Sequence, residues 1–170
     1  VFSVDYRTAP EFKYPCALTD AYDGYLHLLS KGYRANNIAI AGDSAGGGLA
    51  VALCMYIRDR AEAHMPSMLM LSSPWTDLAS EGESYKKNIR RDAIFGTANP
   101  ELSTKYFVPM VYAHENQLHD PYVSPAYGDF SGFPPMLIQT GGDEMLLSDS
   151  KTIAAKAKEK GCDARLFVYP

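Results

Sequence analysis

The sequence predicts an α/β fold, built as a doubly wound, mostly parallel sheet with helices on both faces. Three observations support this prediction. Several short runs are apolar at consecutive positions, which is typical of strands that are covered on both sides. Helical patterns lie between some of these runs, so that strands and helices alternate. Finally, 46% of the 170 residues are hydrophobic, which excludes a disordered chain and fits one domain.

Five segments are predicted to be strands, because they are rich in strand-forming residues or are bounded by turn residues. These segments are Val1–Tyr6, Ile38–Gly42, Met68–Ser72, Met136–Thr140 and Arg165–Tyr169. The chain opens inside the first of them without a Met or a signal peptide, so we expect a piece of a longer, cytoplasmic protein.

Three helices are predicted from the spacing of apolar residues. The first has one apolar face at steps of 4, 3 and 4, formed by Leu18, Tyr22, Tyr25 and Leu29. Gly32 is its expected C-terminal stop. The same steps recur over Leu49–Arg60, and a third helix is expected from about Ser148 to Lys160, with Gly161 ending it.

The region Thr76–Pro135 interrupts this alternation. It is polar at first and contains six prolines, which favours an irregular or short-helical excursion over one edge of the sheet. Within it we expect a helix around Glu101–Ala113 that is interrupted at Pro109. Excursions of this kind often shape a binding cleft.

The composition excludes several classes of partner. The net charge is −4 and no basic stripe is visible, so we do not expect the protein to bind nucleic acid. No apolar run reaches the roughly 18 residues that a membrane span needs. The three cysteines Cys16, Cys54 and Cys162 are widely spaced and form no C-x-x-C pair, which argues against a disulfide scaffold or a zinc knuckle.

A metalloprotease zinc site is also excluded. His114 and His119 are five residues apart rather than four, and this spacing turns the second ligand about 140° away from the first on a helix. We therefore expect neither a metal nor another cofactor.

The most specific feature is the turn between the second predicted strand and the second predicted helix. Gly42-Asp43-Ser44-Ala45-Gly46 has the G-x-S-x-G pattern of a nucleophile elbow. Such a turn holds Ser44 in a strained conformation at a helix N-terminus, where unpaired backbone N–H groups favour negative charge. The N–H of Ala45 is the expected first donor of an oxyanion hole. Gly42 and Gly46 are expected to allow close approach of backbone.

Four motifs, in the same order along the chain, resemble those of the hormone-sensitive-lipase-like branch of the α/β-hydrolases, the bacterial type IV esterases. D-Y-R-x-A-P-E matches Asp5–Glu11, G-D-S-A-G-G matches Gly42–Gly47, S-P-W-x-D-L matches Ser73–Leu78, and D-P-x-x-S-P matches Asp120–Pro125. The resemblance implies a serine esterase that acts on small carboxylic esters, usually with short or medium acyl chains. A homodimer through the edge strand Arg165–Tyr169 is compatible with the family.

The general base of such an enzyme is oriented by a carboxylate that follows the serine in the chain. The loop after Met136–Thr140 carries three candidates. In the family, the catalytic acid lies five residues before a second carboxylate, and counting back from Asp149 selects Glu144. Asp143 stays open as the alternative, and Asp149 is expected to cap the following helix.

The four histidines, His27, His64, His114 and His119, all precede the acid, contrary to the order of the fold. Each is therefore expected to be structural or exposed. The resemblance implies that the base lies beyond Pro170, and that an H-G-G-G loop, a central strand and an N-terminal cap precede Val1. Residues 1–170 are thus expected to be a single partial catalytic domain, inactive on its own.

Two other functions share this fold. One is a non-catalytic member that only binds a small ligand, as the plant gibberellin receptors do. Such a protein would carry another residue at the position, expected beyond Pro170, where an esterase has its histidine. A serine peptidase more often carries an aromatic residue beside the nucleophile, whereas Asp43 and Ala45 flank Ser44 here. The esterase is the preferred hypothesis.

Overall fold

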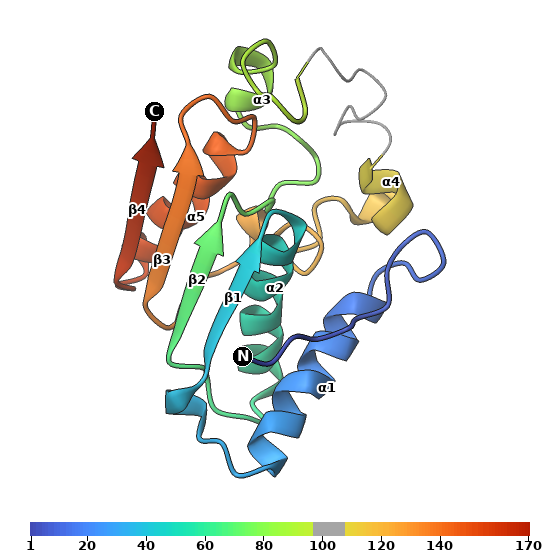
Figure 1. Cartoon of the computed structure of the whole chain (residues 1–170), viewed down its shortest axis with the longest axis vertical. Coiled ribbons are helices and arrows are strands. Elements are labelled where there is room, and N and C mark those ends of the chain that lie inside the picture. Colours follow the sequence, from blue (N-terminus) through green and yellow to red (C-terminus); the bar gives the residue numbers. More distant parts are fainter. Residues whose placement is uncertain (97–107) are drawn as a thin grey trace.

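The computed structural model of the protein describes residues 1–96 and 108–170. Its centre is one parallel sheet with the strand order β1-β2-β3-β4 (Figure 1). The strands are β1 (Ala39–Asp43), β2 (Met68–Ser72), β3 (Met136–Gly141) and β4 (Ala164–Tyr169). Since all neighbours are parallel, the carboxyl ends of the strands lie at one edge of the sheet. The predicted α/β fold and four of the five predicted strands are confirmed.

The three predicted helices are also confirmed. They are α1 (Cys16–Ser30), α2 (Ala45–Arg60) and α5 (Leu147–Glu159). Gly32 and Gly161 follow α1 and α5 with φ of +89° and +79°, the left-handed conformation that glycine adopts without strain. None of the helices in the described ranges is both long and apolar enough to cross a lipid bilayer.

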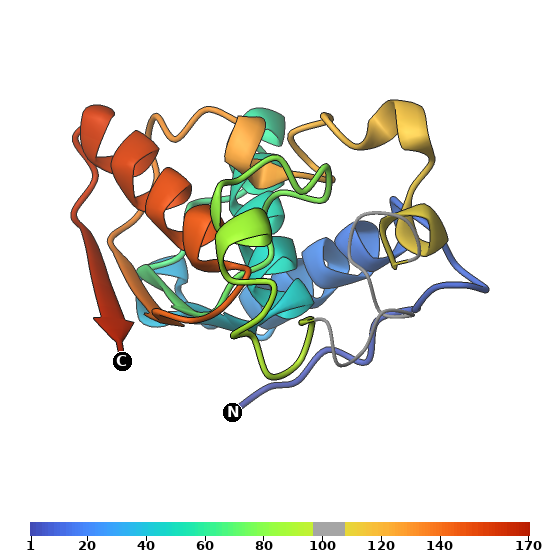
Figure 2. The same cartoon turned by 90° about the horizontal axis from the view of Figure 1, so that it is seen from above.

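Helices α2 and α5 cover one face of the sheet (Figure 2). Leu69 and Leu71 of β2 are buried on that face, among α2, α5 and the neighbouring strands. On the opposite face Met70 is 43% exposed and Phe167 of β4 is 48% exposed. Within the described residues, helices therefore cover one face of the sheet, whereas the sequence predicts helices on both faces. Helix α1 packs against α2.

The prediction of a strand at Val1–Tyr6 is wrong. This segment contains no strand and runs beside α1 (Figure 1). There the ring of Phe2 stacks on that of His27, with 6.2 Å between the ring centroids. A cavity of about 670 Å³ lies between the segment and β1, lined on one side by Val4 and on the other by Ile40. A strand needs a neighbouring strand to satisfy its backbone hydrogen bonds, and no strand in the described ranges pairs with this segment.

The region Thr76–Pro135 has no strand in its described part, in agreement with the prediction. It contains α3 (Ser84–Lys87), α4 (Val108–Tyr112) and the 3-10 turns Glu115–Gln117 and Pro125–Tyr127; a further 3-10 turn, Ala35–Asn37, precedes β1. The predicted helix Glu101–Ala113 lies partly outside the described residues. Pro109 lies within α4, and the residues that precede α4 lie outside the described ranges, so the predicted interruption at Pro109 stays a prediction.

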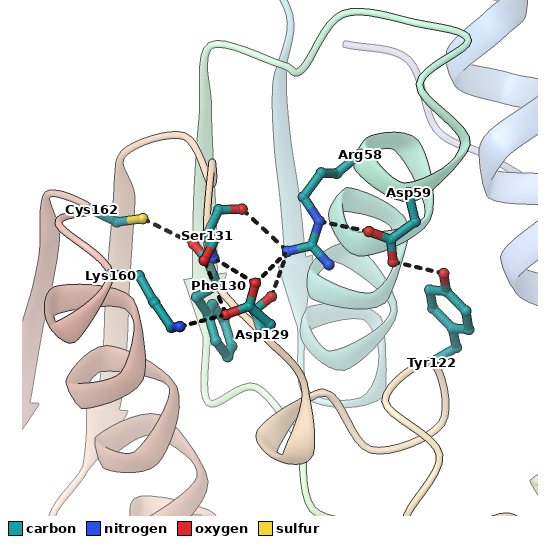
Figure 3. A network of polar contacts seen from close by, with 8 residues as sticks. All are labelled: Arg58, Asp59, Tyr122, Asp129, Phe130, Ser131, Lys160 and Cys162. Atoms are coloured by element: carbon teal, nitrogen blue, oxygen red, sulfur yellow. Dashed lines mark hydrogen bonds and ion pairs between the residues drawn. The ribbon is translucent and has the colours of Figure 1, made fainter.

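A polar network fastens the ends of α2 and α5 to the loop that precedes β3 (Figure 3). Arg58, near the end of α2, donates hydrogen bonds to the carbonyl oxygens of Asp129 at 2.6 Å and Ser131 at 3.2 Å. Lys160, just after α5, forms an ion pair of 3.1 Å with Asp129. Because α2 runs back from the carboxyl end of β1, the network lies at the opposite end of the sheet from Ser44.

Candidate active site

Ser44 lies in the tight turn between β1 and α2, with φ +52° and ψ −120°. This left-handed conformation is strained for any residue other than glycine. Hydrogen bonds hold it on both sides: the Ser44 N–H donates to the carbonyl of Ser72 at 2.9 Å. The Ser44 carbonyl accepts from the N–H of Trp75 at 2.9 Å and from the first turn of α2. The strained turn that the motif predicts is present.

Close packing of backbone explains two of the glycines around Ser44. A Cβ on Gly42 would overlap the carbonyl of Gly46, and a Cβ on Gly48 would overlap the carbonyl of Trp75. Gly42 thus has the role that the sequence predicts. Around Gly46 the described residues leave open space, so the close approach expected there is instead made at Gly48.

At the N-terminus of α2, two polar groups form no hydrogen bond with any described residue, namely the Ser44 hydroxyl and the Ala45 N–H. The Ser44 side chain is half-buried, and its Oγ forms no hydrogen bond with any described residue. Ala45 is the first residue of α2 and is exposed, and its N–H has no acceptor among the described residues. The 16-residue helix adds the positive end of its dipole at this point. An oxyanion formed beside Ser44 would be stabilised here.

Glu144 lies in the loop after β3, and its carboxylate is held by three donors. Oε1 accepts from the Gly141 N–H at 2.7 Å and from the Ser73 hydroxyl at 2.9 Å. Among the described residues, Oε2 accepts only from the Thr140 hydroxyl, at 3.3 Å. Asp143, in contrast, is 63% exposed and pairs with Arg91 at 3.2 Å. The geometry therefore favours Glu144 over Asp143 as an oriented acid.

The parallel sheet brings these loops together. Ser44 follows β1, Ser73 follows β2 and Glu144 follows β3, so all three lie beyond the carboxyl ends of adjacent strands. Ser72 accepts the hydrogen bond from Ser44, and Ser73 donates to Glu144. Residues 72 and 73 thus connect the candidate nucleophile to the candidate acid.

The loop that carries Glu144 is supported from the irregular region. The Asn88 side chain donates to the carbonyls of Gly142 at 3.0 Å and Glu144 at 2.8 Å. The Asp92 carboxylate accepts from the Met145 N–H at 2.6 Å. Neither residue stands out in the sequence, because each lies about fifty residues away in a segment without a motif or a periodic pattern. Ser73 could have been found, since it opens the S-P-W-x-D-L motif.

Asp149 does not cap α5 as expected. The N-cap residue is Leu146, and Asp149 is 1% exposed inside the first turn of the helix. Its Oδ2 accepts from the N–H groups of Thr76 at 2.8 Å and Asp77 at 2.7 Å, and from the Tyr85 hydroxyl at 3.2 Å. Burial raises the pKa of this carboxyl to about 7, although the backbone hydrogen bonds from Thr76 and Asp77 oppose the shift. Asp149 therefore joins the loop after β2 to α5.

None of the four histidines forms a hydrogen bond or ion pair with Ser44 or Glu144 in the described structure. His27 stacks on Phe2 and His119 lies 3.2 Å from Glu81. His64 accepts a hydrogen bond at its backbone carbonyl, and His114 precedes a 3-10 turn. Over residues 1–96 and 108–170, no three or more His, Cys, Asp or Glu side chains are grouped to hold a metal ion.

Known proteins with this arrangement of strands and motifs identify the family. A sequence profile described as the α/β-hydrolase fold matches residues 1–170. The chain belongs to the α/β-hydrolase fold family. The chain is 37% identical over 169 residues to an esterase of Acinetobacter venetianus, covering 99% of this chain and 54% of the relative. It is 36% identical to an acetyl-hydrolase of Streptomyces hygroscopicus, covering 100% of this chain and 55% of that protein.

The solved structures agree with the sequence comparisons. The crystal structure of an esterase from the bacterial hormone-sensitive lipase family superimposes with a TM-score of 0.88 at 37% identity, covering 97% of this chain and 54% of that one. The resemblance to this branch of the α/β-hydrolases is thereby confirmed. The chain spans about half the length of the curated relatives it matches.

The buried carboxyl of Asp149 leads to a prediction about stability. Its folded-state pKa of about 7 lies above the unfolded value of about 4, so it favours the folded state at low pH, and this contribution is lost as the pH rises from about 4 through 7. Asp149→Asn cannot ionise. From pH 5 to pH 8, the stability of the variant should therefore rise relative to wild type by about 2–3 kcal/mol. Urea unfolding of the complete protein at both pH values measures this.

Ser150→Ala provides the matched control, because it alters a buried neighbour and keeps the carboxyl. It should retain the wild-type dependence on pH. Equal pH dependence in wild type and Asp149→Asn would contradict the assignment.

Proposed function

We propose that the complete protein is a serine carboxylesterase. In this proposal Ser44 Oγ attacks the carbonyl carbon of an ester, the alcohol leaves, and water hydrolyses the resulting acyl-enzyme. The observation that carries the proposal is the strained turn at the N-terminus of α2, where neither the Ser44 hydroxyl nor the Ala45 N–H is engaged by a described residue. The names of the relatives, an esterase and an acetyl-hydrolase, support the same chemistry.

The Ala45 N–H is proposed to stabilise the oxyanion that forms when Ser44 attacks. Negative charge develops on the former carbonyl oxygen, next to the N-terminus of α2. One donor of this kind contributes about 3–4 kcal/mol of transition-state stabilisation.

Glu144 is proposed to orient the general base. The base takes the proton of the Ser44 hydroxyl and later returns it to the leaving alcohol. We place this base, a histidine, in the part of the complete protein outside these 170 residues. The supporting observation is that none of His27, His64, His114 and His119 forms a hydrogen bond or ion pair with Glu144 in the described structure.

The second oxyanion donor and a central strand are proposed to come from the same missing part. The cavity of about 670 Å³ beside β1 supports this placement, because it runs along the strand that leads into Ser44. β1 is an edge strand of the described sheet, with Ala39 and Ala41 exposed. A further strand in this cavity would pair with β1 and cover it.

The proposed substrates are esters with short or medium acyl chains. A small cavity of about 120 Å³ opens beside Ala45 and is lined by apolar and aromatic side chains, among them Leu49, Trp75 and Leu78. This small volume supports a preference for acyl groups of a few carbon atoms.

We also propose that β4, the other edge strand of the described sheet, pairs with a second copy in a homodimer.

Replacing the nucleophile tests the central proposal. In the complete protein, Ser44→Ala should lower kcat for a short-chain p-nitrophenyl ester by a factor of about 10⁴ or more, because no acyl-enzyme can form. A fluorophosphonate should label wild type at Ser44 and leave the variant unlabelled. Ser30→Ala, at the end of α1, is a control expected to keep full activity. Unchanged turnover in Ser44→Ala would refute the proposal, and ligand binding without turnover in wild type would favour the receptor-like alternative.

Removing either carboxylate decides between the two acids. Glu144→Gln should lower kcat by about 10³–10⁴, because the base loses its orienting partner. Asp143→Asn should lower kcat less than threefold, because this carboxylate is exposed and paired with Arg91. The reverse order of the two effects would assign the acid to Asp143.

The separate 170-residue chain should have no detectable esterase activity, because it lacks the proposed base and the second oxyanion donor. Its rate per mole should be at least about 10⁴ lower than that of the complete protein in the same assay. Activity in the separate chain that is abolished by Ser44→Ala would instead assign the base to one of its four histidines.

A further inference from the structure

We propose that Ser73 is a positioning residue that fixes the Glu144 carboxylate so that Oε2 is the oxygen offered to the catalytic base. The inference rests on the proposed function, in which Glu144 orients that base. It concerns the role of a side chain in the loop after β2, between the candidate nucleophile and the candidate acid.

The hydrogen bonds of the carboxylate distinguish its two oxygens. Each carboxylate oxygen can accept about two hydrogen bonds. Oε1 already accepts two short ones, from the Ser73 hydroxyl at 2.9 Å and from the Gly141 N–H at 2.7 Å. Oε2 accepts a single long one from Thr140, at 3.3 Å. Oε2 therefore keeps the capacity for an imidazole N–H.

The backbone of Ser73 holds its hydroxyl in place. Ser73 has φ +41°, so its backbone is left-handed, as it is at Ser44. Its N–H donates to the carbonyl of Gln139 on β3 at 2.7 Å. Glycine would adopt this conformation without strain, so the serine is present at some energetic cost. The side chain explains this residue choice, because its hydroxyl spans from β2 to the carboxylate after β3.

The two residues after Ser73 join it to the elbow. A Cβ on Gly47 of α2 would come within 2.8 Å of Pro74, so the two pack closely. The Trp75 N–H donates to the carbonyl of Ser44 at 2.9 Å. The same short segment thus supports the turn at Ser44 and holds the carboxylate of Glu144.

No described cationic side chain forms an ion pair with Glu144. Arg91 pairs with the exposed Asp143 instead. The remaining neighbours of the carboxylate are neutral donors, namely the Gly141 N–H and the Thr140 hydroxyl. Loss of the Ser73 hydroxyl would leave Oε1 with one donor, the Gly141 N–H, and the orientation of the carboxylate would be less constrained.

The test uses the complete protein with Ser73→Ala. Active sites are counted by titration with a fluorophosphonate, so that a smaller folded fraction does not imitate a slower enzyme. We expect kcat per active site to fall about 10- to 30-fold with KM unchanged within twofold, since orientation of the base matters mainly in the transition state. The acid limb of the kcat/KM profile should move to higher pH, because a carboxylate with fewer donors stabilises the protonated base more strongly.

Two further variants separate positioning from stability. Ser73→Gly removes the same hydroxyl and relieves the strained backbone, so it should lose as much kcat as Ser73→Ala without losing thermal stability. Ser67→Ala, at the other end of β2, removes a hydrogen bond of 2.8 Å from its hydroxyl to the Ile38 carbonyl. It should lower the melting temperature and leave kcat and the pH profile unchanged.

Full kcat and an unmoved pH profile in Ser73→Ala or Ser73→Gly would overturn the role of Ser73. If Ser44→Ala and Glu144→Gln are still inactive in that case, the proposed function stands and only this inference fails. If those two variants also keep their activity, the proposed function itself fails.

Discussion

The turn at Ser44 depends on a single constraint: a residue with a side chain must stay in a left-handed conformation, with φ +52°. Such a conformation persists only where the surroundings hold it. Here the carbonyl of Ser72 and the N–H of Trp75 bind the peptide groups on either side of the Ser44 Cα. The absence of a Cβ at Gly42 and Gly48 lets the backbone pass close enough to do so. The hydroxyl is thereby directed by backbone, and its own hydrogen bonds remain available.

The loops at the carboxyl edge of the sheet stabilise one another rather than standing alone. Ser73 reaches the loop after β3, and Asp149 at the start of α5 reaches back to the backbone of Thr76 and Asp77. Asn88 adds hydrogen bonds from the irregular region. These contacts join segments that are 50 or more residues apart in the chain. The position of Glu144 therefore depends on several loops at this edge of the sheet and not on its own loop alone.

The predictable part of the structure is the part that local patterns determine. Short apolar runs bounded by turn residues were sufficient for β1–β4, the spacing of apolar residues was sufficient for α1, α2 and α5, and the G-x-S-x-G pattern located the elbow. Val1–Tyr6 has the residues of a strand, but strand formation also requires a partner strand, which local sequence does not report. Asp149 has the position of a helix cap, but two backbone N–H groups from a distant loop take its carboxylate. Asn88 and Asp92 act only through tertiary contacts and carry no local signal.

The cavity beside β1 also affects how this piece of the protein would behave on its own. Apolar side chains such as Val4, Ile40 and Leu53 line it, and β1 offers backbone groups along its outer edge. An uncovered strand edge next to apolar surface is a template for pairing with other chains. The 170-residue chain, studied by itself, would therefore tend to self-associate along the outer edge of β1.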